Sequence, residues 1–89
     1  MENIYNNPPY EIGDLYIIKT DSVRIYKKDI PVSLYLHKGD WLIVTRFFGS
    51  FTIVLTKYGL CYLYDIAMLD LLYRKQLTKI SQTTKGTNA

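Results

Sequence analysis

A series of short apolar runs separated by tight turn signals constrains the fold more than any other feature. Between residues 14 and 64 the runs are rich in β-branched and aromatic residues, and Gly49-Ser50 and Tyr58-Gly59 are two-residue hairpin signals. The predicted strands are residues 14–20, 23–27, 32–37, 41–48, 51–57 and 60–64. Short strands joined by tight turns predict an all-β barrel or sandwich, because closure hides the strand edges.

The composition supports one small domain with a dense core. A chain of 89 residues is near the lower size limit for folding without disulfides or metals. Apolar residues make up 48% and aromatic residues 15% of the chain, and the single cysteine, Cys61, excludes an intrachain disulfide. We expect an extended arm at residues 1–12, one barrel domain at residues 13–80 and a disordered polar tail at residues 81–89.

The turn before the fourth predicted strand has a physical explanation. Gly39 is expected to take a positive φ where the chain reverses into the sheet. Asp40 is expected to accept hydrogen bonds from turn amides. The alternation that follows predicts that Leu42 and Val44 point inward, so that Trp41 and Ile43 point outward.

The last third changes to a helical period. Asp65 is a good N-cap, and residues 66–80 are predicted to form an amphipathic helix. Leu69, Leu72 and Tyr73 are expected to pack on the barrel, whereas Met68 lies off the apolar stripe. The alternative is a one-turn 3₁₀ segment followed by a last strand over residues 70–77.

A further pattern runs through the strands and ends in the predicted helix, at Leu36, Gly39, Asp40, Leu42, Val44, Phe51, Val54, Gly59, Leu63 and Leu69. Through these positions residues 23–69 resemble the bacterial Src-homology-3 family of small barrels. The resemblance implies a barrel of five or six strands, here with a C-terminal helix. The chain departs from the family in the loop at residues 28–31 and at Tyr62-Leu63. We therefore do not carry over the cell-wall peptide binding of that family.

No pattern of catalytic residues is visible in the sequence. His37 is the only histidine and adjoins a turn, so exposed polar surface is the first interpretation and a base or metal ligand the second. Cys61 lies inside an apolar strand, where a buried, unreactive thiol is expected. The prediction is a protein that is not an enzyme and uses no cofactor and no metal.

Basic and aromatic residues alternate along the predicted strands and suggest a binding face. Its predicted residues are Arg24, Tyr26, Lys28, Tyr35, Trp41 and Arg46. Such a surface can stack bases and neutralise phosphates. The alternative is that the tyrosines pack under the helix while the lysines are merely solvated.

Two functions follow from these features. The first is a non-catalytic binding module, a small accessory or inhibitory protein of phage type that binds a host protein. The second is a small barrel that binds RNA or single-stranded DNA, which the mild net charge of +3 permits but does not require. A structural or oligomer-forming component is a third interpretation.

The expected location is the cytoplasm, which is the host cytoplasm if the protein is phage-encoded. The start of the chain shows no secretion signal, and no apolar run is long enough to cross a membrane. Frequent use of residues with A/T-rich codons suggests an A/T-rich genome, which many bacteriophages and low-GC bacteria have. The apolar stripe of the helix also suggests a homodimer through that helix, as an alternative to packing on its own barrel.

Overall fold

The computed structural model describes residues 9–80, which form seven strands and one helix. In chain order they are β1 (Leu15–Ile18), β2 (Ser22–Ile25), β3 (Leu34–His37), β4 (Trp41–Phe48), β5 (Phe51–Thr56), β6 (Gly59–Tyr64), α1 (Asp65–Tyr73) and β7 (Leu77–Ile80). The prediction of a mainly β fold with a helix near its C-terminal end is confirmed. The predicted arm before residue 9 and the predicted tail after residue 80 lie outside the described residues.

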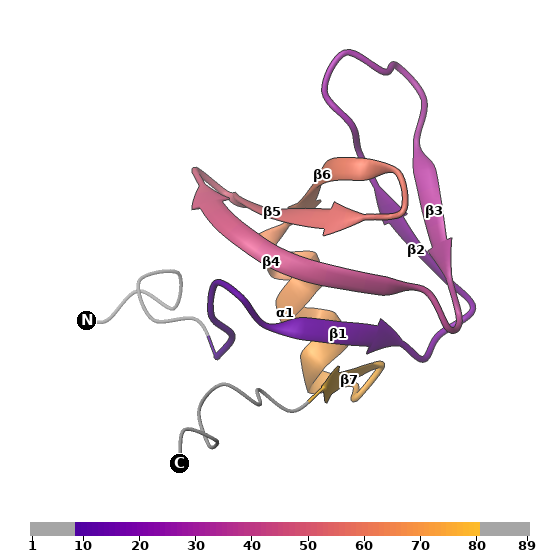
Figure 1. Ribbon diagram of the computed structural model, residues 1–89, viewed down its shortest axis with the longest axis vertical. Helices are drawn as coiled ribbons and strands as arrows, with labels where there is room; N and C mark the ends of the chain where they lie inside the picture. The colour runs from indigo at the N-terminus through magenta and orange to yellow at the C-terminus, as the bar shows by residue number, and fades with distance from the viewer. Residues whose placement is uncertain (1–8, 81–89) are drawn as a thin grey trace.

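The strands form two antiparallel sheets rather than one closed barrel. The larger sheet has the order β6-β5-β4-β1-β7, and the smaller sheet is the hairpin β2-β3. A single bridge between Tyr26 and Tyr62 joins the end of the hairpin to the free edge of β6. Figure 1 shows α1 behind the larger sheet and the hairpin at one end of it. One sheet face is therefore covered, while the other faces the viewer.

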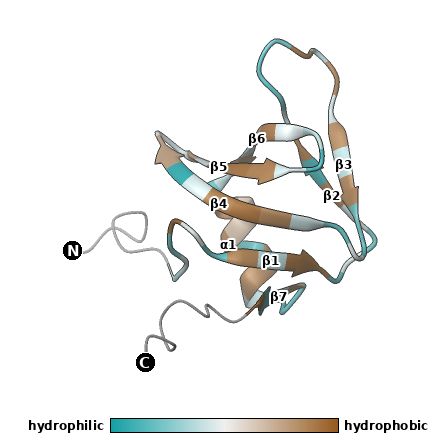
Figure 2. Cartoon of the chain, in the orientation of Figure 1, coloured by the Kyte–Doolittle hydropathy of each residue, from teal (hydrophilic) through white to brown (hydrophobic). Residues whose placement is uncertain are grey.

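The strands β4, β5 and β6 form a meander through two tight turns. At the first turn Gly49 and Ser50 bring Phe48 opposite Phe51, as the sequence predicts. The second turn consists of Lys57 and Tyr58, one position earlier than predicted, because Thr56 pairs with Gly59. The hydropathy colours in Figure 2 show that β1, β4 and β5 are largely hydrophobic.

The turn between β3 and β4 anchors the larger sheet. Gly39 has a φ of +96°, and its N–H donates to the carbonyl oxygen of Ile18 at 2.8 Å. The carbonyl oxygen of Asp40 accepts from the N–H of Ile18 at 2.8 Å, and the Asp40 carboxylate accepts from the N–H of His37 at 2.7 Å. That bond and the ammonium of Lys57 lower the pKa of the Asp40 carboxyl. The predictions for Gly39 and Asp40 are confirmed.

The core lies between the covered face of the larger sheet, the hairpin and the helix. Leu42 and Val44 are buried as predicted, and Trp41 is 37% exposed. Tyr10, within the segment predicted as an extended arm, is buried in the core. The other buried apolar residues are Tyr16, Ile18, Val23, Ile25, Leu36, Val54, Cys61, Leu63, Met68 and Leu77.

The buried polar side chains of the core form two separate hydrogen-bonded groups. The Tyr10 hydroxyl bonds to Thr52 Oγ1 at 2.8 Å, and Thr52 Oγ1 donates to the carboxylate of Asp65 at 2.7 Å. The Tyr16 hydroxyl donates to Asp14 at 3.2 Å, and burial together with that carboxylate raises the pKa of Tyr16. Within residues 9–80 no buried side-chain nitrogen or oxygen lacks a hydrogen bond, as a stable core requires.

The prediction that Asp65 caps the helix through its side chain is wrong. The N-cap is Tyr64, and no side-chain bond caps the helix. The physical reason is that the Asp65 carboxylate is buried and already accepts the hydroxyl of Thr52. Its charge still lies in the first turn of the helix, where the helix dipole favours an acidic residue.

The prediction that the helix extends over residues 66–80 is also wrong. The helix ends at Tyr73, and the chain then turns through Lys75, which has a φ of +60°. Residues 77–80 pair with β1 as an antiparallel strand, and Leu77 is buried. The free edge of β1 decides this outcome because backbone pairing outweighs a local helical period. The alternative from the sequence was right that a last strand exists, but its 3₁₀ segment is an α-helix, and its strand over residues 70–77 overlaps β7 only at Leu77.

The helix also turns a different side to the core than predicted. Met68 is fully buried, whereas Tyr73 is 87% exposed and Ile66 is 65% exposed. Leu69 and Leu72 are partly buried against the core. Because apolar residues lie on both sides of this short helix, the sequence period alone cannot tell which side is inside.

We predict that Gly39→Ala destabilises the protein by about 1–2 kcal/mol, because an L side chain at this positive φ strains the backbone. The space around the position is open, so the cost comes from conformation and not from a clash. Urea unfolding measures the change, with Ser50→Ala at the exposed turn of β4-β5 as the matched control. An unchanged midpoint for Gly39→Ala would show that the turn does not depend on this conformation.

We predict that Met68→Ala destabilises by about 2–5 kcal/mol, the usual range for a fully buried large side chain. Tyr73→Ala is expected to change the free energy of unfolding by less than about 0.5 kcal/mol, since the side chain is mostly in solvent. Thermal or urea unfolding of both variants provides the comparison. Equal effects at the two positions would contradict the burial of the helix described above.

Candidate functional site

The uncovered side of the larger sheet is the most prominent surface of the molecule. We call it the outer face and define it by cross-strand rows, because residues directly opposite each other on antiparallel strands point to the same side. Strand β4 contributes one residue to each of four such rows, namely Trp41, Ile43, Arg46 and Phe48. Strands β4, β5 and β6 contain no carboxylate, and Arg46 is their only charged residue.

One row of the outer face is entirely aliphatic and crosses all five strands. Its members, in order from β7 to β6, are Ile80, Leu15, Ile43, Leu55 and Leu60. Leu60 is 53% exposed, and Leu55 and Ile80 are each 38% exposed. Contiguous exposed apolar surface of this kind marks interaction sites in soluble proteins.

The next two rows are Arg46–Ile53–Tyr62–Tyr26 and Phe48–Phe51–Tyr64. What we call the aromatic band consists of the aromatic residues and the arginine of these rows together with the pair Arg24–Tyr35 of the hairpin: Tyr35, Arg24, Tyr26, Tyr64, Tyr62, Phe51, Phe48 and Arg46. The Phe51 ring packs on Tyr64 at 4.6 Å and on Tyr62 at 5.4 Å, measured between ring centroids. These distances are typical of favourable aromatic pairs.

An arginine lies at each end of the aromatic band. The Arg24 guanidinium lies 5.9 Å from the ring centroid of Tyr35, and the Arg46 guanidinium lies 5.9 Å from that of Phe48. Both distances are within the range of cation–π attraction. Hydrogen bonds to Tyr26 and Tyr35 raise the pKa of Arg24, and an arginine side chain is always positively charged in proteins.

A β-bulge brings Arg46 and Phe48 to the outer face. Val44 pairs with Val54 on the buried side, and the next pair is Arg46 with Ile53, so the register shifts by one residue. Simple alternation from Val44 would turn Arg46 and Phe48 inward. The extra residue reverses the side of the sheet to which the following side chains point, and bulges near binding sites commonly redirect side chains in this way.

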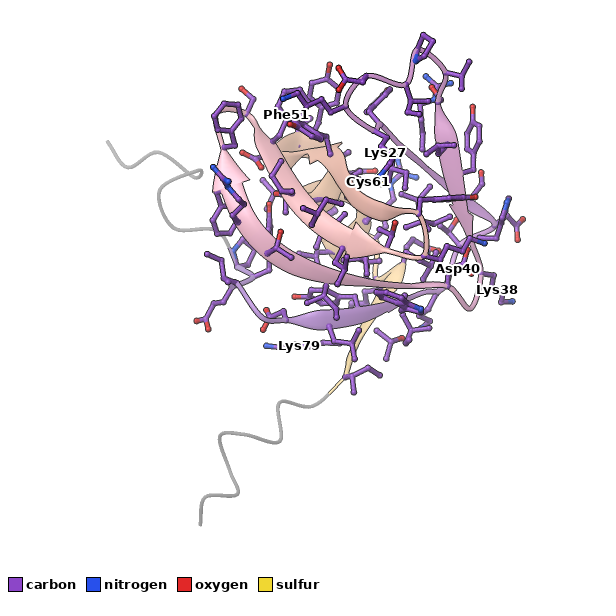
Figure 3. The ribbon with its side chains drawn as sticks, turned by 45° about the horizontal axis from the view of Figure 1, so that its top comes forward. Lys27, Lys38, Asp40, Phe51, Cys61 and Lys79 are labelled. Carbon is purple, nitrogen blue, oxygen red and sulfur yellow. The ribbon has the colours of Figure 1, made fainter. Side chains whose placement is uncertain are left out.

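The structure brings five of the six predicted binding residues to one region. Arg24, Tyr26, Tyr35 and Arg46 belong to the aromatic band. Lys28 lies in the loop after β2 rather than on a strand, and it borders the same region as Arg46. Trp41 is also on the outer face but at the far end of β4, opposite Ile17 of β1. Figure 3 shows this separation, with Phe51 at one end of the sheet and the Lys38–Asp40 turn at the other.

A hollow of about 250 Å³ opens on the outer face between the aliphatic row and the aromatic band. Its lining residues are Lys28, Arg46, Phe48, Ile53, Leu60 and Tyr62. Ile53 forms a nearly buried floor, and Phe48 is 57% exposed at the rim. A site with an apolar floor and two cations at its edge can hold an apolar group that carries negative charge nearby.

The sequence interpretation missed Phe48, Phe51, Tyr62 and Tyr64. A signal for the first two was present, since the two-residue turn Gly49-Ser50 places its flanking residues directly opposite each other. The tyrosines follow from continuing that register into β6. The sequence contains no signal for the hollow, because the shape of the hollow depends on the β-bulge in β4.

The other residues considered for chemistry have structural surroundings. The Nδ1 atom of His37 lies 3.2 Å from the carbonyl oxygen of Asp21 at the surface, and Cys61 is buried in the core. Within the part of the chain that the structure describes, no group of three His, Cys, Asp or Glu side chains could hold a metal ion. That the protein is not an enzyme stays a prediction.

A second hollow lies on the exposed side of the helix. It is lined by Pro9, Ile66, Leu69, Asp70, Leu72 and Tyr73. Its lining is mostly apolar, and it is the surface that the predicted homodimer through the helix would use. Nothing in residues 9–80 covers it, and the homodimer stays a prediction.

Comparisons of this chain with protein-family models, with curated proteins and with solved structures give no match. Its resemblance to bacterial Src-homology-3 barrels therefore stays a prediction. Across residues 9–80, no helix has the length and apolar character needed to cross a membrane. The function has to be argued from the outer face itself.

We predict that the Cys61 thiol does not react with 5,5′-dithiobis(2-nitrobenzoate) in the folded protein, because it is fully buried. The same thiol should react completely once the protein is unfolded in guanidinium chloride, which serves as the control. The rate in the native protein should follow the population of opened molecules. Rapid stoichiometric reaction without denaturant would show that Cys61 is accessible and would reopen a chemical role for it.

Proposed function

We propose that this protein is a non-catalytic binding module whose outer face binds another protein. The observation that carries the proposal is the uncovered sheet face itself, apolar and aromatic across five strands and free of carboxylates on β4, β5 and β6. Antiparallel sheets with one solvated face normally alternate apolar and polar residues. A face that is apolar on its solvent side is explained by a partner that covers it.

The composition of this face favours a protein partner. Tyrosine, phenylalanine, tryptophan and arginine predominate, and these residue types except phenylalanine supply most binding hot spots. Lysine is scarce on it, and the lysine at its edge is Lys28. The aliphatic row beside the aromatic band offers surface that only another apolar surface can cover.

A second function, binding of RNA or single-stranded DNA, is favoured by one observation. Arg24 and Arg46 each lie over an aromatic ring, and such pairs can stack bases and contact phosphates. The aliphatic row argues against this function because it provides no ring for stacking and no charge for phosphate. We therefore place it second.

More specifically, we propose that the protein is a small accessory or inhibitory protein of phage type that acts on a host protein in the cytoplasm. The barrel closure expected from the Src-homology-3 resemblance belongs to the same proposal. The bridge from Tyr26 to Tyr62 supports it, because it continues the larger sheet toward the hairpin.

We predict that Phe48→Ala and Leu60→Ala each weaken retention of the partner in affinity capture by about 1.5–3 kcal/mol, because both line the hollow and a covered apolar side chain of this size contributes that much. Both side chains are more than half exposed, so the variants should fold normally. Ile66→Ala is the matched control, because this exposed apolar residue lies on the helix. Capture from lysate of the source cells is compared with and without nuclease.

Two results would contradict the proposal. One is retention that disappears after nuclease treatment, together with salt-dependent binding of an oligonucleotide that weakens in Arg24→Ala and Arg46→Ala. That result would establish the second function instead. The other is partner retention that is lost in Ile66→Ala but unchanged in Phe48→Ala and Leu60→Ala, which would move the site to the helix.

A further inference from the structure

The shape and the charge of the hollow on the outer face limit which group of the partner can bind there. This inference rests on the proposed function, because it concerns the same surface. The nearly buried floor of the hollow is Ile53, and Phe48, Leu60 and Tyr62 also line it. Its volume of about 250 Å³ is sufficient for one large side chain. Aliphatic atoms below and ring edges beside it suit an aromatic side chain.

The charges around the hollow are all positive. Lys28 and Arg46 belong to its lining, and no carboxylate does. Neither cation forms an ion pair with another described residue, whereas Lys57, Arg74 and Lys79 do. The two cations are therefore available to a ligand, and the ligand that complements them is acidic.

The row of residues that crosses the hollow sets the length of a ligand that could reach both cations. Arg46, Ile53, Tyr62 and Tyr26 form one row across β4, β5, β6 and the end of the hairpin. Three strand spacings of ~4.8 Å each separate the ends of this row by about 14 Å. Arg46 begins this row, and Lys28 lies in the loop two residues beyond its other end, so a ligand that meets both cations has to span about this length.

An extended peptide has matching dimensions. Its residues rise by about 3.4 Å each, so positions i−2 and i+2 lie about 14 Å apart and point to the same side as position i. We propose that the hollow receives an extended acidic segment of the partner, with an aromatic side chain at position i and carboxylates at positions i−2 and i+2. The aromatic side chain fills the hollow, and the two carboxylates meet Lys28 and Arg46.

The probe that tests this proposal is the blocked peptide Gly-Asp-Ser-Phe-Ser-Asp-Gly, titrated into the full chain and followed by NMR chemical shifts. We expect saturable shifts at Ile53, Leu60 and Tyr62. A peptide with asparagine in place of both aspartates should bind about fivefold or more weakly, since exposed ion pairs each contribute modestly. A peptide with the aspartates at i−1 and i+1 should be weakened similarly, because those side chains point away.

The protein variants provide the second arm of the test. Lys28→Gln and Arg46→Gln should each weaken the acidic peptide about two- to fivefold. They should also reduce the salt dependence of its binding. Lys38→Gln is the matched control, because Lys38 is an exposed cation at the far end of the sheet (Figure 3). It should leave the peptide affinity unchanged.

The failure of this inference is distinguishable from the failure of the proposed function. If Phe48→Ala and Leu60→Ala abolish partner capture while the acidic peptide binds no better than its asparagine form, the inference is wrong and the proposed function stands. If the peptide binds as expected but capture does not depend on Phe48 or Leu60, the hollow is supported and the proposed function fails. Saturation of the same resonances by oligothymidylate more tightly than by the acidic peptide would overturn the inference in favour of nucleic acid.

Discussion

The β-bulge between Val44 and Arg46 is the constraint on which the outer face depends. Before it, β4 buries Leu42 and Val44 and pairs with β1; after it, the strand exposes Arg46 and Phe48 and pairs only with β5. A strand of eight residues with strict alternation would have buried a guanidinium in the core, at a cost of several kcal/mol. The extra residue avoids this cost and at the same time assembles the cationic end of the aromatic band.

The fold covers one face of the larger sheet and leaves the other exposed. The helix, through Met68, and the hairpin fill the covered side, and the buried polar chain from Tyr10 to Asp65 fixes the helix start against β5. On the solvent side the apolar residues are too many and too contiguous to be scattered surface residues. The two sides of one sheet are therefore both apolar, but only one of them has a partner within residues 9–80.

The strands and turns could be predicted from the sequence, because β-branched runs and turn residues act locally. The φ of Gly39, the carboxylate bonds of Asp40 and the inward direction of Leu42 and Val44 all followed from that reasoning. The end of the helix and strand β7 did not, because they depend on the free edge of β1, which is distant in the sequence. Of the candidate site, the pairing of Phe48 with Phe51 was readable from the turn, but the bulge that turns Phe48 outward was not.

The sheet edge nearest the aromatic band favours binding through the face rather than by strand addition. An added strand needs free backbone groups, and two of those on β3 are occupied by side chains. The carbonyl oxygen of Tyr35 accepts from the Tyr58 hydroxyl at 2.9 Å, and the N–H of His37 donates to Asp40 at 2.7 Å. A partner strand at β3 would have to break both bonds, whereas the outer face offers exposed apolar side chains. Because side chains block this edge, we expect a partner to gain more binding free energy on the outer face of β4, β5 and β6 than by strand addition at β3.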